Sequence, residues 1–383
     1  MIDSLVRFVR DQYSTLGFVP LHAPELMGKE REYVCGAIES TFVSSVGAFV
    51  DRFELEMARY TGSERCVATV NGTAALHIAL ILAGVRTGDL VITQPLTFVA
   101  TCNAIRYCGA DPIFVDVNRG TLGLSPAAVE EWLSKNAEID KDGLCRVGRA
   151  GKIVRACVPM HTFGHPADLD GLVAVCKRWG IELVEDAAES LGSLYKGRHT
   201  GVFGSLAAIS FNGNKIITTG GGGMILCDGE LGVRAKHLTT TAKVPHQYEY
   251  VHDEIGYNYR LPNLNAALGC AQLERLESFV FAKRKLAERY SQLFAGSEYR
   301  FVTEPDGCRS NYWLNAVICP DRDSRDALLA KTNQENVMTR PIWALMNRLP
   351  MFNDCLKGPL DNAEWLEERV VNLPSSVIPE LMQ

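Results

Sequence analysis

The sequence lacks paired cysteines. Its 12 cysteines are scattered singly from Cys35 to Cys355, and none falls in a Cys-x-x-Cys pair. Cys102 and Cys108 lie six residues apart with no histidine spaced to complete a zinc site, so we expect no metal centre. Single thiols suit a reducing compartment, and we therefore expect a cytoplasmic protein whose cysteines are mostly small core residues.

Long hydrophobic runs and a basic excess are also missing. No stretch reaches the roughly 18 apolar residues that a membrane span needs. Charged side chains interrupt the first residues, where a signal peptide would have its apolar core. The formal net charge is −6, which argues against a surface that binds nucleic acid. We expect neither membrane nor nucleic acid as a partner.

What the sequence has is an alternation of short apolar runs and helical patterns. Runs that are apolar on both faces, separated by helices, predict an α/β fold with a mostly parallel central sheet. The ligands of such sheets bind beyond the carboxyl ends of the strands. The predicted strands are 66–70, 90–93, 112–117, 154–160, 181–185, 206–211 and 223–228, and the predicted helices between them include 73–84, 126–133 and 169–179.

The alternation of predicted strands and helices changes after Arg260. Residues 263–294 predict one or two long helices, followed by short strands and helices to the end of the chain. A length of 383 residues suits one large domain with a smaller one. We therefore predict a large domain at 1–260 and a smaller C-terminal domain at 261–383.

Four features fall at predicted strand ends, and the first is Asn-Gly-Thr-Ala-Ala at 71–75. Gly72 lets a ligand approach the backbone, and Thr73 opens a helix. The free N–H groups and positive end of that helix suit a phosphate. An ordinary helix cap explains the same residues.

The second feature is Val-Glu-Asp-Ala-Ala-Glu-Ser at 184–190. We expect Asp186 to project from the strand end, where its carboxylate can keep a heterocyclic nitrogen protonated by charge pairing. The alternative is that Glu185 and Asp186 only cap the following turn.

The third feature is the stretch Ser-Phe-Asn-Gly-Asn-Lys-Ile-Ile-Thr-Thr-Gly-Gly-Gly-Gly at 210–223. Ser210 is placed to reach a phosphate. Lys215, in the loop beyond, becomes a nucleophile toward carbonyl groups if a cleft desolvates it. The glycines at 220–223 let the chain pass a bulky ligand. A flexible turn with a solvated lysine is the alternative.

The fourth feature is Phe98, which follows a strand and begins a helix. An aromatic side chain there can stack on a planar ring, although a phenylalanine is more often a core residue. A phosphate cradle, a ring stacker, a carboxylate for a ring nitrogen and a lysine for an aldehyde together suit pyridoxal phosphate. We therefore predict that Lys215 forms a Schiff base with this cofactor.

Motifs along nearly the whole chain resemble those of the DegT/StrS-type nucleotide-sugar aminotransferases. The resemblance implies the fold of the aspartate aminotransferase superfamily (fold type I of the pyridoxal phosphate enzymes), with a smaller C-terminal α+β domain. It also implies a homodimer with two shared active sites. The matching stretches are NGTAALHIAL, TFVATCNAI, FVDV, HTFGHPADLD, VEDAAESLGSLYKGRHTG, SFNGNKIITTGGGG and GYNYRLPNLNAALGCAQL.

The resemblance also implies roles for individual residues. Lys215 matches the Schiff-base lysine, Asp186 the partner of the pyridine nitrogen, and Glu189 the residue that contacts the ring hydroxyl. Gly221 departs from the pattern, because the family often has glutamate there, and this puts local loop contacts in doubt. The other implied cofactor residues are Gly72, Thr73, Ala74 and Ser210 at the phosphate, Phe98 on the ring, and Asn258, which reaches the phosphate of the partner subunit.

Residues 239–246 and the stretch that follows look most like a narrower group of these enzymes. Its members aminate C4 of a UDP-linked 4-keto-6-deoxy-N-acetylhexosamine for bacterial surface glycans. We therefore expect this sugar and L-glutamate as substrates, with 2-oxoglutarate as a product. The alternative is another keto nucleotide sugar, with a 3-keto group or a GDP or dTDP carrier.

Candidate sugar contacts are His161, Tyr312 and Arg340, in segments that the resemblance places around the nucleotide-sugar pocket. Three other readings are weaker. A related dehydratase has histidine in place of Lys215, and a non-catalytic sugar-binding relative is expected to lose Lys215 or Asp186. A metal site is disfavoured because Pro166 breaks the helix on which its ligands would sit; those ligands would be His161, His165, Asp168 and Asp170.

Overall fold

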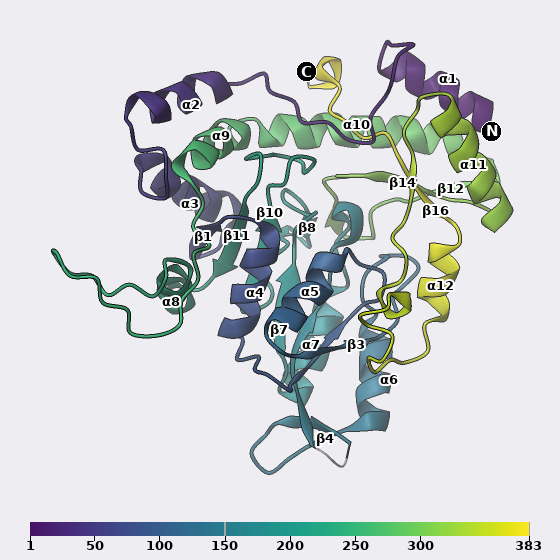
Figure 1. The fold of residues 1–383 in the computed structure, drawn as a ribbon. Helices are drawn as coiled ribbons and strands as arrows, with labels where there is room; N and C mark the ends of the chain where they lie inside the picture. The colour runs from purple at the N-terminus through teal and green to yellow at the C-terminus, as the bar shows by residue number, and fades with distance from the viewer. Residues whose placement is uncertain (149–150, 383) are drawn as a thin grey trace.

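A computed structural model of the chain describes residues 1–148 and 151–382. Its central sheet has the strand order β1-β11-β10-β7-β6-β2-β3 (Figure 1). Neighbours from β10 to β3 are parallel, whereas β11 is antiparallel to both β1 and β10. The strands are β1 (Arg65–Thr69), β2 (Leu90–Thr93), β3 (Asp111–Phe114), β6 (Lys152–Val158), β7 (Glu182–Asp186), β10 (Leu206–Ser210) and β11 (Gly223–Cys227).

The predicted strands and helices are all present, with ends shifted by a few residues. Helices connect several of the strands, and the sheet is mostly parallel, as predicted. A hairpin of β4 (Ala137–Ile139) and β5 (Cys145–Val147), which no periodicity indicated, extends the sheet beside β6. The helices of this part are α3 (Ala48–Thr61), α4 (Gly72–Leu82), α5 (Val99–Tyr107), α6 (Pro126–Asn136), α7 (Leu169–Trp179) and α8 (Gly229–Thr239).

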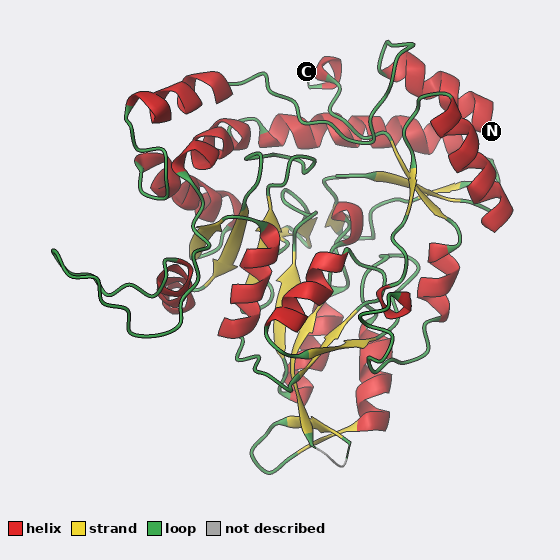
Figure 2. Cartoon of the chain, viewed as in Figure 1, coloured by secondary structure: helices red, strands yellow, loops and turns green. Residues whose placement is uncertain are grey.

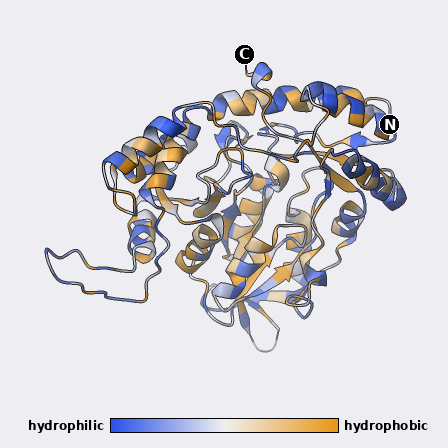
Figure 3. Ribbon diagram, turned by 45° about the horizontal axis from the view of Figure 1, so that its top comes forward, coloured by the Kyte–Doolittle hydropathy of each residue, from blue (hydrophilic) through white to orange (hydrophobic). Residues whose placement is uncertain are grey.

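Helices cover both faces of the sheet because alternate strand residues point to opposite sides. In β10, Ala208 packs into the cluster that contains residues of α4, α5 and α8. Its neighbours Ala207 and Ile209 pack into the cluster that contains Phe53 of α3. Helices α6 and α7 pack on β2, β3, β6 and β7. Figure 2 shows the strands enclosed by helices, and Figure 3 shows apolar residues gathered on the strands and on the helices around them.

The C-terminal part has its own antiparallel sheet, in the order β12-β14-β16-β15. The long helix α10 runs along one end of the central sheet in Figure 1. The N-terminal helix α1 (Ile2–Gln12) packs beside α11, so both ends of the chain contribute to this part. The predicted division at residue 260 stays a prediction. The elements are α9 (Asn263–Leu273), α10 (Leu276–Phe294), β12 (Arg300–Phe301), β14 (Asn315–Ile318), α11 (Arg322–Gln334), β15 (Arg340–Pro341), α12 (Asp361–Glu367) and β16 (Val370–Leu373).

An arm formed by residues 243–256 projects from the body between α8 and α9 (Figure 1). Its two sides are joined by the Lys243–His252 bridge and by the hydrogen bond from the Val244 N–H to the Val251 carbonyl, 2.9 Å long. Large apolar side chains on the arm are exposed, among them Tyr250 at 80% and Ile255 at 85%. The other small elements are α2 (Glu30–Glu39), β8 (Leu194–Tyr195), β9 (Arg198–His199) and β13 (Cys308–Arg309).

Most cysteines are buried in the core, as predicted. No helix within the described residues is long and apolar enough to cross a bilayer.

Candidate active site

Lys215 lies in the loop between β10 and β11. A turn closed by the 2.9 Å hydrogen bond from its N–H to the Asn212 carbonyl fixes the backbone. The Nζ atom lies 3.3 Å from Oε1 of Glu189 and 3.9 Å from the centroid of the Trp313 ring. Trp313 is held in turn by the 2.7 Å bond from its Nε1 to the Asn214 carbonyl. The lysine side chain is only 11% exposed, so it is not the solvated surface lysine of the alternative reading.

Asp186 is the last residue of β7, and its carboxylate is held from two sides. Oδ2 accepts a 2.7 Å hydrogen bond from the Thr101 hydroxyl, and Oδ1 accepts a 3.2 Å bond from the Ala188 N–H. The Thr101 hydroxyl also lies 2.9 Å from that of Thr97, which continues the chain of polar groups. These bonds fix the orientation of the Asp186 carboxylate at the end of β7.

Glu189 connects the lysine loop to the segment that follows β6. Its Oε2 accepts a 2.9 Å hydrogen bond from the Phe163 N–H, while Oε1 faces Lys215. Burial raises the pKa of Glu189 to about 7, although the positive charge of Lys215 lowers it. The carboxyl group therefore changes its protonation state near neutral pH, within contact distance of the lysine amine.

The predicted phosphate cradle is assembled where α4 begins beside the end of β10. A Cβ on Gly72 would lie 2.8 Å from Cβ of Ser210, so only glycine allows this approach. A Cβ on Gly223 would lie 2.6 Å from the Gly72 nitrogen, which gives this glycine a packing role within the chain itself. The first-turn N–H groups of Gly72 and Thr73 have no intrahelical partner. The Ala74 N–H donates to Oδ1 of Asn71 at 2.7 Å, so of the three predicted amides it is the one already bonded.

Phe98 and Asn258 are the two remaining predicted cofactor residues. Phe98 is the residue before α5, half exposed, three residues from the threonine that holds Asp186. Asn258 lies at the base of the arm, where its Oδ1 accepts a 3.0 Å hydrogen bond from Nη2 of Arg260. The predicted contact of Asn258 with a partner's phosphate stays a prediction.

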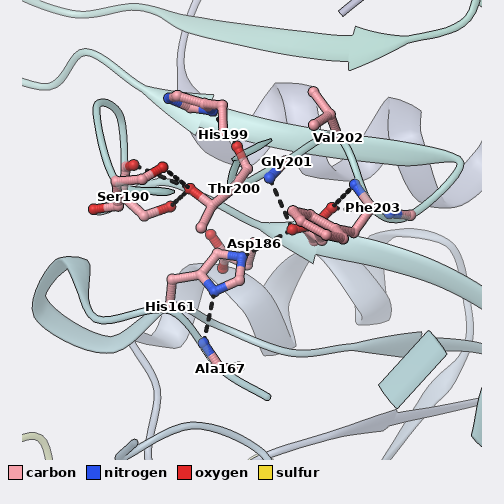
Figure 4. Close-up of polar contacts among 12 residues, drawn as sticks. His161, Ala167, Asp186, Ser190, His199, Thr200, Gly201, Val202 and Phe203 are labelled. Carbon is pink, nitrogen blue, oxygen red and sulfur yellow. Dashed lines mark hydrogen bonds and ion pairs between the residues drawn. The ribbon is translucent and has the colours of Figure 1, made fainter. Parts of the chain in front are cut away.

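His161 is fully buried in a hydrogen-bonded network (Figure 4). Its Nδ1 accepts a 3.1 Å bond from the Ala167 N–H, so Nε2 carries the proton and donates to Oε2 of Glu185 at 3.0 Å. Glu185 also accepts hydrogen bonds from the N–H groups of Gly201, Phe203 and Gly204. Burial opposes its ionisation, but the bonds from His161 and these amides hold the pKa of Glu185 below its usual value. Both nitrogens of His161 are engaged, so in this structure the ring fixes two loops and offers no free nitrogen to a sugar.

The other two sugar candidates are Tyr312 and Arg340. The buried Tyr312 hydroxyl accepts a 3.0 Å hydrogen bond from the Glu304 N–H, whereas its neighbour Trp313 contacts Lys215. Arg340 lies exposed on β15, the edge strand of the smaller sheet. Of the neighbours Tyr312 and Trp313, Trp313 is the one in contact with the lysine.

Three contacts were missed from the sequence. Thr101 lies in the matching stretch TFVATCNAI, and Trp313 follows the sugar candidate Tyr312, but the sequence alone does not say which side chain faces the site. Phe163 contributes through its backbone N–H, for which side-chain identity carries little signal.

Comparisons with known proteins identify the family of the chain. Residues 24–381 match the model of the DegT/DnrJ/EryC1/StrS aminotransferase family. The chain is 35% identical over 360 residues to a GDP-perosamine synthase of Escherichia coli O157:H7, covering 94% of this chain and 93% of that protein. It is 33% identical over 362 residues to a GDP-perosamine synthase of Vibrio cholerae, covering 93% and 94%.

Solved structures give the same result. The aminotransferase TlmJ of Streptoalloteichus hindustanus superposes with a TM-score of 0.83 at 30% identity, covering 93% of each chain. The relatives support the alternative left open above, a GDP-linked sugar, better than the UDP-linked sugar first expected. The predicted fold type, the aminotransferase class and the cofactor, pyridoxal phosphate, are confirmed. This chain therefore belongs to the DegT/DnrJ/EryC1/StrS aminotransferase family.

Proposed function

We propose that this enzyme transfers an amino group from L-glutamate to C4 of a GDP-linked 4-keto-6-deoxy sugar. The observation that carries the chemistry is the contact of Lys215 Nζ with Glu189, 3.3 Å away, beside the fixed carboxylate of Asp186. The carrier nucleotide is proposed from the similarity to two GDP-perosamine synthases over more than nine-tenths of each chain.

The residues present fit pyridoxal phosphate. The free amides of Gly72 and Thr73 and the hydroxyl of Ser210 suit its phosphate, and Gly72 leaves room for the approach. Asp186 suits the ring nitrogen, and Phe98 suits the ring face. When bound, the cofactor supplies an electron sink for the carbon that loses or gains a proton.

Lys215 has two tasks in this proposal. Its amine holds the cofactor, and when it is released it carries a proton to and from the reacting carbon as general base and acid. Glu189 lies at hydrogen-bonding distance from the same nitrogen and titrates near neutrality, so it can accept or return a proton there. Trp313 covers one side of the amine, with its ring centroid 3.9 Å from Nζ, and shields it from water.

Asp186 acts through its charge. Thr101 and the Ala188 N–H hold both carboxylate oxygens, which fixes the orientation of the group. A fixed, buried negative charge raises the proton affinity of a nitrogen that faces it. Asp186 would therefore hold the proton on that ring nitrogen in both halves of the transfer.

The proposal includes a homodimer with shared sites. The arm at 243–256 exposes several large apolar side chains, including Tyr248 and Tyr250, which a second copy of the chain would cover. Asn258 lies at the base of the same arm. Replacing both tyrosines with serine is expected to give monomers in sedimentation and to lower activity. Dimers that persist unchanged would show that the arm does not form the interface.

A UDP-linked N-acetylhexosamine remains the second candidate, because the stretch from residue 239 to 274 resembles enzymes of that group. The test is a panel of GDP-, UDP- and dTDP-linked 4-keto and 3-keto sugars, assayed for glutamate-dependent amination by the purified protein with cofactor. We expect the GDP-linked 4-keto sugar to react fastest. Faster reaction with a UDP-linked sugar would contradict the proposed GDP carrier. If the protein aminates none of these sugars, the proposed function is wrong.

Two variants control this assay. Lys215→Ala is expected to abolish amination. Lys196→Ala is matched to it, because Lys196 is also a loop lysine in a carboxylate pair, with Asp170, but is exposed. It is expected to retain full activity.

A further inference from the structure

Gln94 lies directly after β2 and is fully buried. An amide that is shielded from water destabilises the fold unless its donors and acceptors are bonded, and both ends of this side chain are. Its Oε1 accepts hydrogen bonds from the N–H groups of Leu124 at 2.8 Å and Met160 at 3.2 Å. Its Nε2 donates to the Leu96 carbonyl at 2.8 Å, the Leu122 carbonyl at 3.4 Å and the Thr162 hydroxyl at 3.2 Å.

The amide of Gln94 therefore joins three segments that are far apart in the sequence. Residues 94–97 follow β2, residues 122–124 precede α6, and residues 159–163 follow β6. Backbone N–H groups bind one end of the side chain, and carbonyl groups bind the other. Only a group that accepts at one end and donates at the other satisfies both sets, which a carboxylate or a hydrocarbon does not.

Met160 connects Gln94 to the backbone of Asp186. The Met160 N–H donates to Gln94, while Met160 itself forms a parallel bridge with Asp186. The bridge consists of a 2.9 Å bond from the Asp186 N–H to the Pro159 carbonyl and a 3.2 Å bond from the His161 N–H to the Asp186 carbonyl. The position of Asp186 at the end of β7 therefore depends on a segment that Gln94 holds.

The side chain of Asp186 is connected to the same glutamine by another route. Gln94 binds the Leu96 carbonyl, and the next residue is Thr97, whose hydroxyl lies 2.9 Å from that of Thr101. Thr101 in turn donates a 2.7 Å bond to Oδ2 of Asp186. The backbone and the carboxylate of Asp186 are thus both tied to residues that Gln94 holds.

Thr162 connects Gln94 to Glu189. The Thr162 hydroxyl accepts a bond from Gln94, and the next N–H along the chain, that of Phe163, donates to Oε2 of Glu189 at 2.9 Å. The segments that hold Asp186 and Glu189 therefore meet at one buried amide.

We propose that Gln94 is a positioning residue that sets the spacing of Asp186 and Glu189, an assignment that rests on the roles proposed and predicted above for these carboxylates. Asp186 is proposed at the ring nitrogen of the cofactor, and Glu189 is predicted at its ring hydroxyl. Two groups that bind one rigid ring need their separation fixed to within about 0.5 Å. Gln94 acts on this separation through the backbone segments that it joins.

The phosphate cradle provides an internal reference for this proposal. Gly72, Thr73 and Ser210 lie at the start of α4 and the end of β10, whereas the bonds of Gln94 go to the segments after β2 and β6 and before α6. Loss of these bonds should therefore weaken the binding of the cofactor ring and leave the binding of phosphate unchanged.

The test compares Gln94→Met with Asn263→Leu in the cofactor-free protein. Methionine has a similar length and lacks the amide. Asn263 is the matched control, because its buried amide also joins distant segments, α9 to Phe42 and Phe49. Both variants should lower the melting temperature, since each leaves buried backbone groups without a partner.

Only Gln94→Met should change the binding of the ring. In an absorbance titration it should weaken binding of pyridoxal phosphate by about tenfold, whereas Asn263→Leu should bind it as wild type does. Inorganic phosphate is then used as a competitor of pyridoxal phosphate. Its inhibition constant in Gln94→Met should stay within about twofold of the wild-type value, because the helix N-terminus and Ser210 still bind it.

Gln94→Glu tests the same point with a variant of the same shape. The new carboxyl still accepts from the Leu124 and Met160 N–H groups, but its second oxygen needs a proton to bind the carbonyls that face it. Burial raises the pKa of such a group. Relative to wild type at the same pH, binding of pyridoxal phosphate should be nearly normal at about pH 5.5 and weaken towards about pH 8.5, as the carboxyl ionises.

Normal affinity for pyridoxal phosphate in Gln94→Met, or affinity of Gln94→Glu that does not depend on pH relative to wild type, would overturn the proposal. Equal weakening of inorganic phosphate, or an equal effect of Asn263→Leu, would also overturn it, because each would indicate a general loosening of the fold. A failure of the proposed function looks different: wild type would bind the cofactor but aminate no sugar.

Discussion

The carboxyl group of Glu189 offers the sharpest test of the electrostatics around Lys215. Glu189→Gln keeps the size of the side chain and removes its titration. Burial raises the pKa of this group from its usual 4.5 to about 7, so ionising it costs free energy in the folded protein. A raised pKa favours the folded state at low pH, and that contribution is lost as the pH increases from about 4.5 to about 7.

The magnitude follows from the two pKa values. Relative to the protonated state, ionisation of Glu189 destabilises the fold by about 1 kcal/mol at pH 5 and by about 3 kcal/mol at pH 8. For a chain of 383 residues, the entropy of unfolding converts the difference of about 2 kcal/mol into about 3 °C in melting temperature. Glu189→Gln lacks this contribution.

The assay is thermal unfolding of the cofactor-free protein between pH 5 and pH 8. The melting temperature of Glu189→Gln minus that of wild type should increase by about 3 °C over this range. Comparison of the two proteins cancels the titration of all other groups. Two parallel pH profiles would refute the reasoning, because they would show that Glu189 is ionised throughout and that its contact with Lys215 is an ordinary ion pair.

Two further predictions concern groups that hold the site together. Thr101→Val removes a hydrogen bond to the Asp186 carboxylate. In an absorbance titration it should weaken binding of pyridoxal phosphate to the cofactor-free protein by about tenfold or more. The control Thr332→Val, which removes a buried hydroxyl on α11, should bind the cofactor normally. His161→Leu leaves the buried Glu185 carboxylate without its imidazole partner and should lower the free energy of unfolding by about 3 kcal/mol in a denaturant titration; an unchanged stability with a raised sugar KM would instead make His161 a sugar contact.

The sheet was predictable because its strands are buried on both faces. Runs such as 90–93 and 206–211 are apolar at successive positions, and helix patterns between them leave a parallel arrangement as the simple solution. The hairpin at β4 and β5 was not predictable in this way. Its strands are three residues long and partly exposed, so they show no hydrophobic periodicity.

Site residues were easiest to predict where their role depends on residues close to them in the sequence. Asp186 follows directly from the end of its strand, and Gly72 from the start of its helix. Contacts that join distant segments, such as Glu189 with Lys215 or Trp313 with the same lysine, depend on how long loops pack. The adjacent residues Tyr312 and Trp313 contact different groups, Glu304 and Lys215, and composition alone does not decide which of them faces the lysine. The sequence alone does not distinguish a buried histidine that holds a loop, such as His161, from one that binds a ligand.

The measurement that tests the central claim most directly is the position at which the cofactor is attached. Wild-type protein loaded with pyridoxal phosphate is reduced with borohydride, digested and analysed by peptide mass spectrometry. The account predicts the reduced adduct on the peptide that contains Lys215 and its loss in Lys215→Ala. An adduct on any other lysine, with Lys215 unmodified, would contradict it.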